Sequence, residues 1–248
     1  GVPDFKAGQF LTLGLPLESK IVNRAYSIAS SPENKKFFEF VIRWVRRPLP
    51  GRLTSLLFNA KIGDKISWAK PAGNLTINDT LASGEKDTRR IVCIGGGTGL
   101  APFVSFAQHL HDTNDKREIV VLHGASYVDE LSYKDLLTGL EDDSIAKGKD
   151  EWNFKYRAAI SRPQEWFNRS WAGQVGRVET FLRPRDNGTS ALEELIGDKI
   201  TQQNTIFYVC GWQGTIDGVM DFLNPKGFVT EHNKREDGSF EVKYESYG

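Results

Sequence analysis

The chain has 248 residues, of which 39% are hydrophobic and 26% are charged. Lysine and arginine balance aspartate and glutamate at 32 each, so there is no net field to attract nucleic acid or an anionic membrane surface. No apolar run approaches the roughly 20 residues of a membrane span, and no signal peptide is visible, so we expect a cytoplasmic protein with no membrane partner.

Residues 1–86 are predicted to form a β-rich domain. Short runs rich in β-branched and aromatic residues, broken by Pro, Gly and Asn, predict strands at 10–15, 24–29, 37–45 and 65–69. One helix is predicted over 51–59, with leucines on one face. Several short strands in so few residues are typical of a small antiparallel β-barrel. The first strand opens only ten residues into the chain, so either the chain is trimmed or the barrel is short.

Residues 87–248 are predicted to form an α/β domain. Strands are expected at 89–94, 118–123, 154–160 and 205–210, and helices at about 100–111, 129–140, 191–195 and 215–223. Such alternation is typical of a doubly wound parallel sheet. The charged stretches 141–151 and 231–238 are expected to be surface loops. The predicted fold is therefore a two-domain one, an antiparallel β-barrel followed by a parallel α/β sheet.

Two segments of the first domain could bind a nucleotide. In Arg24-Ala25-Tyr26-Ser27 a cation, a flat ring and a hydroxyl share one strand, on which Arg24 and Tyr26 point to one face and Ser27 to the other. An ordinary strand with a core tyrosine is the alternative. Gly51-Arg52-Leu53-Thr54 opens a helix whose free backbone N–H groups could hold a pyrophosphate, the alternative being a simple capped helix.

Two segments of the second domain lie where a strand ends. Gly95-Gly96-Gly97-Thr98-Gly99 joins a strand to a helix, the context of a dinucleotide site, yet it matches neither the Rossmann fingerprint nor a P-loop. Cys210-Gly211 ends another strand, and Gly211 would permit close approach of a nicotinamide. A buried cysteine and a turn glycine are the alternative. The chain's two cysteines are expected to be buried thiols, too few for an iron–sulfur cluster.

Further charged residues carry weaker signals. Arg162 follows the predicted strand at 154–160, and Arg157 and Arg177 are further basic residues of this domain. Arginine suits a 2′-phosphate, but each could be only a solvated charge. The four histidines show no metal-ligand spacing, so we expect no metal site.

Taken together, these segments resemble the ferredoxin/flavodoxin–NADP(H) reductases of the bacterial type. The resemblance rests on their order and spacing over nearly the whole chain, including Lys70–Leu75, Thr98–Phe103 and His123-Gly124. It implies a reductase that uses FAD and NADP(H) and exchanges electrons with a ferredoxin or flavodoxin. It implies cofactor-binding roles for Arg24, Ala25, Tyr26, Ser27, Ile42, Gly51, Arg52, Leu53, Thr54, Gly97, Thr98, Gly99, Arg162, Arg177 and Gly211. It also implies that Ser27 and Cys210 lie near the nicotinamide, and that a C-terminal tyrosine, Tyr244 or Tyr247, covers the flavin.

The sequence departs from this family in ways that keep alternatives open. Ser126-Tyr127 stands where the family often has an arginine, which weakens the preference for NADP over NAD. An acidic carrier would need a basic docking face, for which Lys35, Lys36, Arg46, Arg47 and Arg52 are candidates. The alternatives are an NADH-dependent reductase of an oxygenase or cytochrome, or a nucleotide-binding electron-transfer module without turnover. We expect a monomer.

Overall fold

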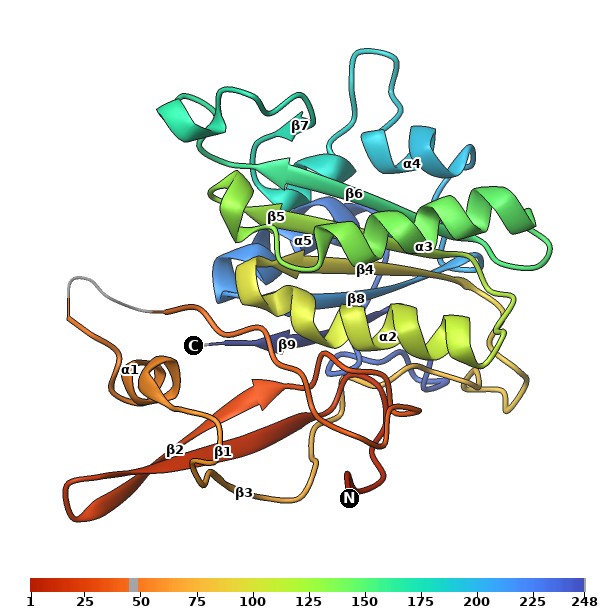
Figure 1. Ribbon diagram of the computed structural model, residues 1–248. Coiled ribbons are helices and arrows are strands. Elements are labelled where there is room, and N and C mark those ends of the chain that lie inside the picture. Colours follow the sequence, from red (N-terminus) through yellow and green to blue (C-terminus); the bar gives the residue numbers. More distant parts are fainter. Residues whose placement is uncertain (45–48, 248) are drawn as a thin grey trace.

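The computed structural model describes residues 1–44 and 49–247, and it contains two units (Figure 1). The first unit carries a three-stranded antiparallel sheet of order β2-β1-β3. The second carries a six-stranded parallel sheet of order β7-β6-β5-β4-β8-β9. The predicted two-domain class, antiparallel β followed by parallel α/β, is therefore confirmed.

The N-terminal sheet is built on a long hairpin. Strands β1 (Phe10–Leu17) and β2 (Lys20–Ser27) pair antiparallel along their whole length, and β3 (Ser67–Trp68) adds a short pairing to β1. Helix α1 (Arg52–Asn59) packs against the hairpin and buries Leu53. The small core beneath the sheet consists of Phe5, Leu11, Leu13 and Ile28. The three strands form an open sheet in the described residues, where a closed barrel was expected.

The strand predicted at 37–45 is wrong in the described residues. Residues 37–44 contain one isolated bridge, between Ile28 and Phe40, and Val45 lies outside the described residues. Phe38 and Phe40 nevertheless pack against the small core, as the alternating pattern suggests. Alternation reports which side chains are buried, whereas a strand also needs a neighbour with which its backbone can pair.

The C-terminal unit alternates strands and helices around the parallel sheet. Its strands are β4 (Arg90–Gly96), β5 (Ile119–Ala125), β6 (Phe154–Ile160), β7 (Gln174–Val175), β8 (Thr205–Gly211) and β9 (Val242–Ser246). Its α-helices are α2 (Ala101–Asp112), α3 (Lys134–Lys147), α4 (Ala191–Ile196) and α5 (Gln213–Leu223). Short 3₁₀ helices are η1 (Gly97–Leu100), η2 (Val128–Glu130), η3 (Trp166–Asn168), η4 (Val178–Leu182) and η5 (Asn224–Lys226).

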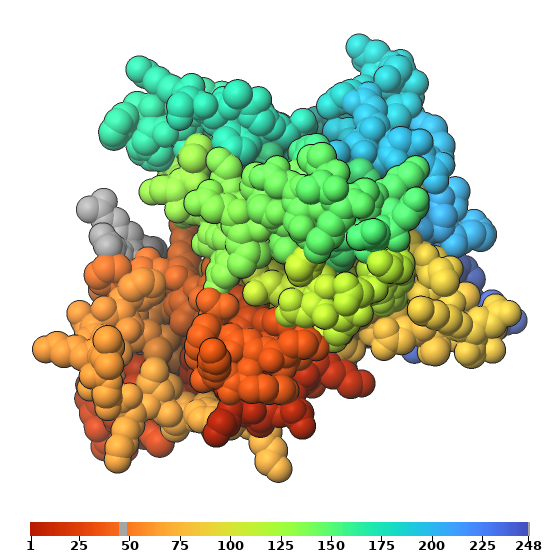
Figure 2. Space-filling view, turned by 45° about the vertical axis from the view of Figure 1, so that its right-hand side comes forward, coloured from red at the N-terminus to blue at the C-terminus, as the bar shows by residue number. Residues whose placement is uncertain are grey.

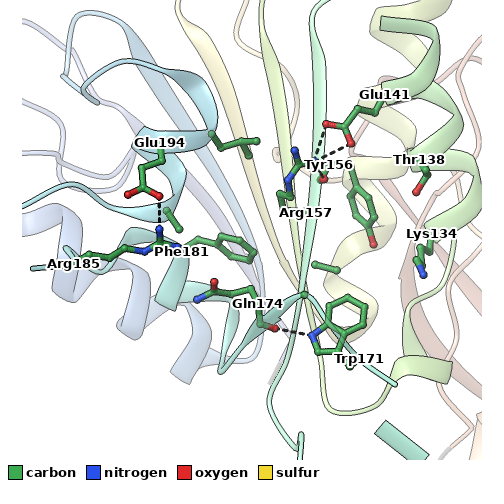
Figure 3. A pocket seen from close by; sticks show the side chains of 14 residues that line it. Lys134, Thr138, Glu141, Tyr156, Arg157, Trp171, Gln174, Phe181, Arg185 and Glu194 are labelled. Atoms are coloured by element: carbon green, nitrogen blue, oxygen red, sulfur yellow. Dashed lines mark hydrogen bonds and ion pairs between the residues drawn. The ribbon is translucent and has the colours of Figure 1, made fainter. Parts of the chain in front are cut away.

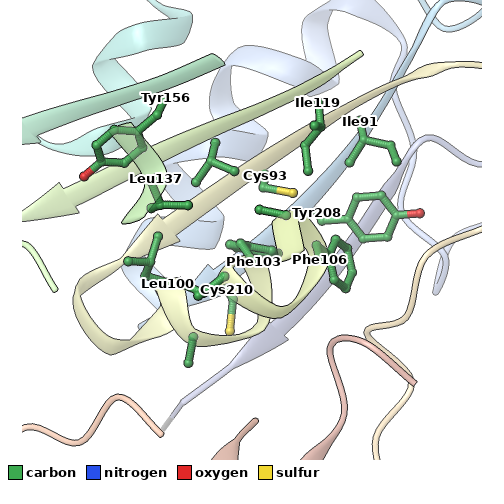
Figure 4. Close-up of a cluster of buried hydrophobic side chains, with 14 of the residues drawn as sticks. Ile91, Cys93, Leu100, Phe103, Phe106, Ile119, Leu137, Tyr156, Tyr208 and Cys210 are labelled. Carbon is green, nitrogen blue, oxygen red and sulfur yellow. The ribbon is translucent and has the colours of Figure 1, made fainter. Parts of the chain in front are cut away.

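Apolar layers cover both faces of this sheet. Alternate residues of each buried strand point to opposite sides, so Cys93 lies in one layer and Val92 in the other. The first layer packs under α2 and α3 and includes Phe103, Phe106 and Tyr208 (Figure 4). The second packs under η4 and α5. Because the strands are buried on both faces, they are nearly continuous apolar runs, which is why the sequence located them well.

One further sequence prediction is wrong in this unit, and one strand was not predicted. Helix α3 begins at Lys134 and continues to Lys147, through much of the stretch expected to be a loop. Its charged turns are stabilised by an ion pair of 2.7 Å between Lys147 and Asp143, and the buried Ser144 hydroxyl donates to the carbonyl of Trp152. Strand β9 was not predicted, because its five residues were interpreted as part of a C-terminal tail.

The two units share a hydrogen-bonded interface. Ser105 Oγ and Gln108 Nε2, both on α2, donate to the carbonyls of Ser30 and Ala29, at 2.8 and 3.0 Å. Near the other end, the backbone N–H of Asn78 donates to the buried hydroxyl of Tyr208 at 2.7 Å. In the space-filling view the red and orange N-terminal unit lies directly against the yellow-green helix α2 (Figure 2). The segment after β2 is thereby held over the C-terminal unit.

Candidate functional site

The candidate site lies where the order of the parallel strands reverses. From β4 the chain proceeds outward through β5, β6 and β7, and it then returns to place β8 on the other side of β4. In such sheets, ligands bind at this switch point, beyond the carboxyl ends of the strands. Gly95 on β4 pairs with both His123 on β5 and Cys210 on β8. The two strand-end motifs found in the sequence, far apart along the chain, therefore meet here.

The glycine turn after β4 contacts the end of β8 closely. A Cβ atom on Gly99 would lie 2.1 Å from the Cys210 carbonyl oxygen, so only glycine fits between the turn and β8. Gly97 has φ of +58°, and a Cβ there would meet no atom within 4 Å. The turn is therefore tight against β8 and open on the side of Gly97. The backbone N–H groups at the start of η1 are the donors that could bind a phosphate, because at the start of α2 the N–H of Ala101 already donates to the Thr98 carbonyl and Pro102 has none.

Ser27, Cys210 and Tyr247 come together at this edge. Ser27 Oγ and the Tyr247 hydroxyl lie 2.6 Å apart, and the backbone N–H of Tyr247 donates to the carbonyl of Gly211 at 2.9 Å. The Tyr247 hydroxyl also interacts with the Cys210 thiol. Burial raises the pKa of both groups, so the thiol is a neutral neighbour rather than a nucleophile at neutral pH. This triad joins the end of β2 to the end of the chain.

The structure distinguishes the two C-terminal tyrosines. Tyr247 packs against the apolar layer under α2, on the side of Ser27. Tyr244 packs against the opposite layer, with its ring 5.1 Å from that of His232. Tyr244 and Tyr247 are three positions apart on an extended segment that runs beside β8. Successive side chains of such a segment alternate between its two faces, so the two tyrosines point to opposite faces. Tyr244 is therefore not brought to the Ser27 edge, whereas Tyr247 is.

Two titratable groups at this edge were given no role by the sequence analysis, which named His123 only as part of the His123-Gly124 segment and did not single out Glu245. Burial raises the pKa of Glu245, which pairs with Cys210 across β8 and β9. Burial also lowers the pKa of His123 to about 4, partly opposed by the nearby backbone of Gly97. The His123 ring is fully buried; Nδ1 lies 3.4 Å from the Tyr156 hydroxyl, and Nε2 has no hydrogen-bond partner among the described residues. Only the pairing of β9, which was not predicted, could have placed Glu245 here.

The segment predicted to hold a flavin leads into this edge. Ser27 ends β2, and the half-buried Tyr26 ring lies 6.5 Å from that of Phe40; burial raises the pKa of Tyr26. Ala25 pairs with Thr12, and the exposed Arg24 donates from Nη1 to the carbonyl of Asn23 at 2.7 Å.

The predicted pyrophosphate helix presents an uncapped N-terminus. Gly51 is the N-cap of α1 and supplies no side-chain hydrogen bond, and no acidic residue stands in the first turn. Thr54 Oγ1 donates to the Gly51 carbonyl at 3.4 Å, Arg52 is exposed, and Leu53 anchors the helix. Ile42 lines an apolar cavity of about 550 Å³ between α1 and the sheet, together with Phe40, Leu57 and Trp68. The free N–H groups of α1 and the exposed Arg24 suit the pyrophosphate of one dinucleotide, and the open turn at Gly97 suits that of a second.

The two predicted phosphate-binding arginines lie at the same end of the sheet. Arg162 follows β6; its guanidinium lies over the Tyr127 ring at 5.2 Å and donates to the Tyr127 hydroxyl. Arg177 follows β7, and its guanidinium approaches the first turn of α5, 3.5 Å from the place of a Cβ on Gly214. Arg157 is different, because both oxygens of Glu141 bind it at 2.8 and 2.9 Å.

Arg157 lines a separate cavity of about 510 Å³ between α3 and α4 (Figure 3). Trp171 and Tyr156 also line this cavity. Two Arg–Glu ion pairs form part of its lining, Arg157–Glu141 and Arg185–Glu194. None of the other residues that were predicted to bind a cofactor lines it.

Within residues 1–44 and 49–247, no group of three or more His, Cys, Asp or Glu side chains is arranged to hold a metal ion. In the same residues, no helix has the length and apolar character needed to cross a membrane.

Comparisons with known proteins agree with this geometry. Residues 93–221 match the oxidoreductase NAD-binding domain family, and residues 2–77 match the oxidoreductase FAD-binding domain family. One component of the Na(+)-translocating NADH-quinone reductase of Marinomonas sp. (strain MWYL1) is 32% identical over 218 residues, covering 85% of this chain and 47% of that protein. The flavodoxin/ferredoxin–NADP reductase of Buchnera aphidicola is 26% identical over 247 residues, covering 96% and 86%.

A solved structure shares the fold. The ferredoxin NADP+ reductase of Neisseria gonorrhoeae with bound FAD and NADP superposes with a TM-score of 0.73 at 23% identity, covering 98% of this chain and 87% of that one. The chain spans about half the length of several curated relatives that it matches. The chain therefore belongs to the family of oxidoreductases that join an FAD-binding domain to an NAD-binding domain, and it has the fold of the ferredoxin–NADP reductases.

Proposed function

We propose that this chain is an FAD-dependent reductase that exchanges electrons between NADP(H) and an acidic one-electron carrier, a ferredoxin or flavodoxin. The observation that carries the proposal is the meeting of Ser27, Cys210 and Tyr247 at the switch point, beside a glycine turn that could hold a pyridine nucleotide. FAD, when bound, would supply hydride exchange with the nicotinamide and one-electron exchange with the carrier.

Different segments of the chain bind the two nucleotides. Arg24, Tyr26 and the N-terminus of α1 hold the flavin dinucleotide, through a cation, a ring and free N–H groups. Gly97 to Gly99 hold the pyrophosphate of NADP(H), and Arg162 and Arg177 bind its 2′-phosphate. Ser27 and the neutral Cys210 thiol orient the nicotinamide, and the apolar walls around them exclude water.

The docking face for an acidic carrier would lie on the N-terminal unit. Lys35 is engaged in an ion pair of 2.9 Å with Asp4, whereas Lys36 and Arg52 are exposed. Arg46 and Arg47 lie outside the described residues. Lys36 and Arg52 are therefore the described residues that we propose for the carrier.

The visible spectrum of the purified protein under anaerobic conditions tests the proposal. Flavin bands that bleach at once on addition of stoichiometric NADPH are expected, followed by reduction of a ferredoxin or flavodoxin added in excess. A protein without flavin bands, or one whose flavin ignores both nicotinamide nucleotides, would contradict it.

A second candidate is an NADH-dependent reductase module of a larger electron-transfer protein. Tyr127 stands beside Arg162 at the place where the family often has an arginine, and several relatives that the chain half covers have names with NADH. Faster bleaching by NADH than by NADPH, without reduction of the acidic carrier, would favour this candidate.

The position of Tyr247 leads to a prediction about nucleotide binding. If the nicotinamide must stack where the Tyr247 ring lies, the ring has to move, and the energy of its contact with Ser27 opposes binding. Tyr247→Ser is then expected to lower the Kd for NADP+ by about tenfold. Difference spectra of the flavin during titration with NADP+ would measure it.

The test uses a point variant, because a truncation that begins at Tyr244 would remove most of β9 and its pairing with β8. Tyr244→Phe is the matched control, since Tyr244 lies against the opposite apolar layer. An unchanged Kd and an unchanged hydride-transfer rate in the Tyr247→Ser protein would show that the Tyr247 ring does not have to move for the nicotinamide to bind.

A further inference from the structure

Arg177 is held by a neighbouring carboxylate. Its Nε lies 2.6 Å from Oε1 of Glu179, and the Arg177 side chain is 56% exposed whereas that of Glu179 is 12% exposed. The other carboxylate oxygen, Oε2, is buried and has no hydrogen-bond partner in the described part of the chain. Among the described residues, Arg177 is the one ion-pair partner of Glu179. The Glu179 carboxylate therefore offsets the charge of the guanidinium at Nε, while more than half of the Arg177 side chain is exposed to solvent.

The pair lies over the first turns of α5, close to the switch point. A Cβ on Gly214 would lie 3.5 Å from Arg177 Nη2, and one on Gly218 would lie 2.9 Å from Glu179 Oε1. The two glycines are one turn apart on α5 and leave the room that the pair occupies. Val178, between the two charged residues, packs against Gly124 near the end of β5. The backbone therefore holds both side chains at the nucleotide-binding end of the sheet.

We propose that Glu179 sets the preference between NADPH and NADH by competing for Arg177; this inference rests on the proposed function, in which Arg177 binds the 2′-phosphate. A phosphate monoester carries a charge of about −1.5 to −2 at pH 7. It has to share a guanidinium that already binds a carboxylate, and it approaches that carboxylate's own negative charge. A ribose with a free 2′-hydroxyl meets no such repulsion. Glu179 thus weakens the selection for the phosphorylated nucleotide, and the chain accepts both.

The test compares Glu179→Gln with the wild type, both loaded with FAD. Binding of 2′-phospho-AMP and of AMP is measured by calorimetry, so the readout does not depend on turnover. Removal of the negative charge is expected to lower the Kd for 2′-phospho-AMP by about five- to tenfold and to change that for AMP by less than about twofold. The gain is expected to shrink as salt is added, because the pair is partly exposed.

Glu194→Gln is the matched control. It removes the carboxylate of another Arg–Glu pair, Arg185–Glu194, which lines the cavity between α3 and α4 (Figure 3). The change in net charge is the same, so equal gains in both variants would overturn the inference as a general charge effect. Glu179→Met, which also removes the charge, gives the same comparison if the glutamine variant does not fold.

The outcomes separate this inference from the proposed function. AMP binding with an unchanged ratio of the two Kd values in the Glu179 variants would overturn the inference alone. Weaker binding of both nucleotides would also overturn it, because Glu179 would then have only a structural role. Binding of neither nucleotide to any variant, including the wild type, would overturn the proposed function and the inference together.

Discussion

Substitution of Gly99 by alanine is expected to lower kcat/KM for NADPH by about 100-fold while the flavin spectrum stays unchanged. A Cβ at this position would lie 2.1 Å from the carbonyl oxygen and 2.6 Å from the carbonyl carbon of Cys210. These are backbone atoms of β8, which is paired on both sides by β4 and β9, so they cannot rotate away as a side chain would. The turn must shift by on the order of 1 Å, and such a displacement misplaces the nucleotide relative to the flavin. Stopped-flow measurement of flavin reduction by NADPH would give the effect.

Gly139→Ala is the control for this substitution. Gly139 lies within α3, and a Cβ there would meet no atom within 4 Å, so alanine is expected to raise helix stability slightly and to leave kcat/KM unchanged. A Gly99→Ala protein with normal kcat/KM would mean that the turn does not hold the nucleotide. A protein that loses FAD would mean instead that the turn supports the interface between the two units.

Replacement of His123 by phenylalanine is expected to make the free energy of unfolding fall less steeply as the pH decreases from 7 to 4.5. The pKa of the buried imidazole is lowered to about 4, against an ordinary value of 6.5, so the unfolded chain binds a proton that the folded chain resists. The neutral ring therefore contributes stability above pH 6.5, and this contribution is lost as the pH falls toward 4. The wild type is expected to lose about 2 kcal/mol relative to the variant between pH 7 and pH 4.5. Urea denaturation over this pH range measures the difference.

His232→Gln is the control, because His232 is exposed, with its ring 5.1 Å from that of Tyr244. The pKa of Tyr156, whose hydroxyl lies near the imidazole, is raised by burial, so this group does not titrate between pH 4.5 and 7. Glu245 titrates in both proteins, and its contribution cancels in the comparison. If the free energy of unfolding falls equally with pH in the wild type and in His123→Phe, the imidazole is protonated as readily in the folded chain as in the unfolded one.

The parallel sheet was the part of the fold most visible in the sequence. The predicted strands at 154–160 and 205–210 agree with β6 and β8 almost to the residue, because both are buried apolar runs that end in turns. The antiparallel unit was less visible. The two strands of its long hairpin are joined by a short turn at Glu18, where φ is +55°. Glycine is the residue that usually marks such a turn in a sequence, and this turn has none.

In the candidate site too, the local motifs could be recognised in the sequence, whereas the contacts between distant residues could not. Arg24 to Ser27, the glycine turn and Cys210-Gly211 were recognisable because each motif is local, its residues being neighbours in the chain. The contact between Ser27 and Tyr247 joins residues 220 positions apart, and the choice between Tyr247 and Tyr244 depends on how β9 pairs with β8. The partner of Arg177 was also hidden, since Glu179 is one of many acidic residues and only its burial makes it distinct.

By itself, the sequence determined the two-domain class, the buried parallel strands and the segments that could hold two nucleotides. These depend on apolar runs, glycine positions and residue types, which act over a few residues. The tertiary structure alone decided which strand ends meet at the switch point, which tyrosine reaches Ser27 and which carboxylate holds Arg177. These depend on pairing and packing between distant segments, whose register and burial are set by the whole fold rather than by any local pattern.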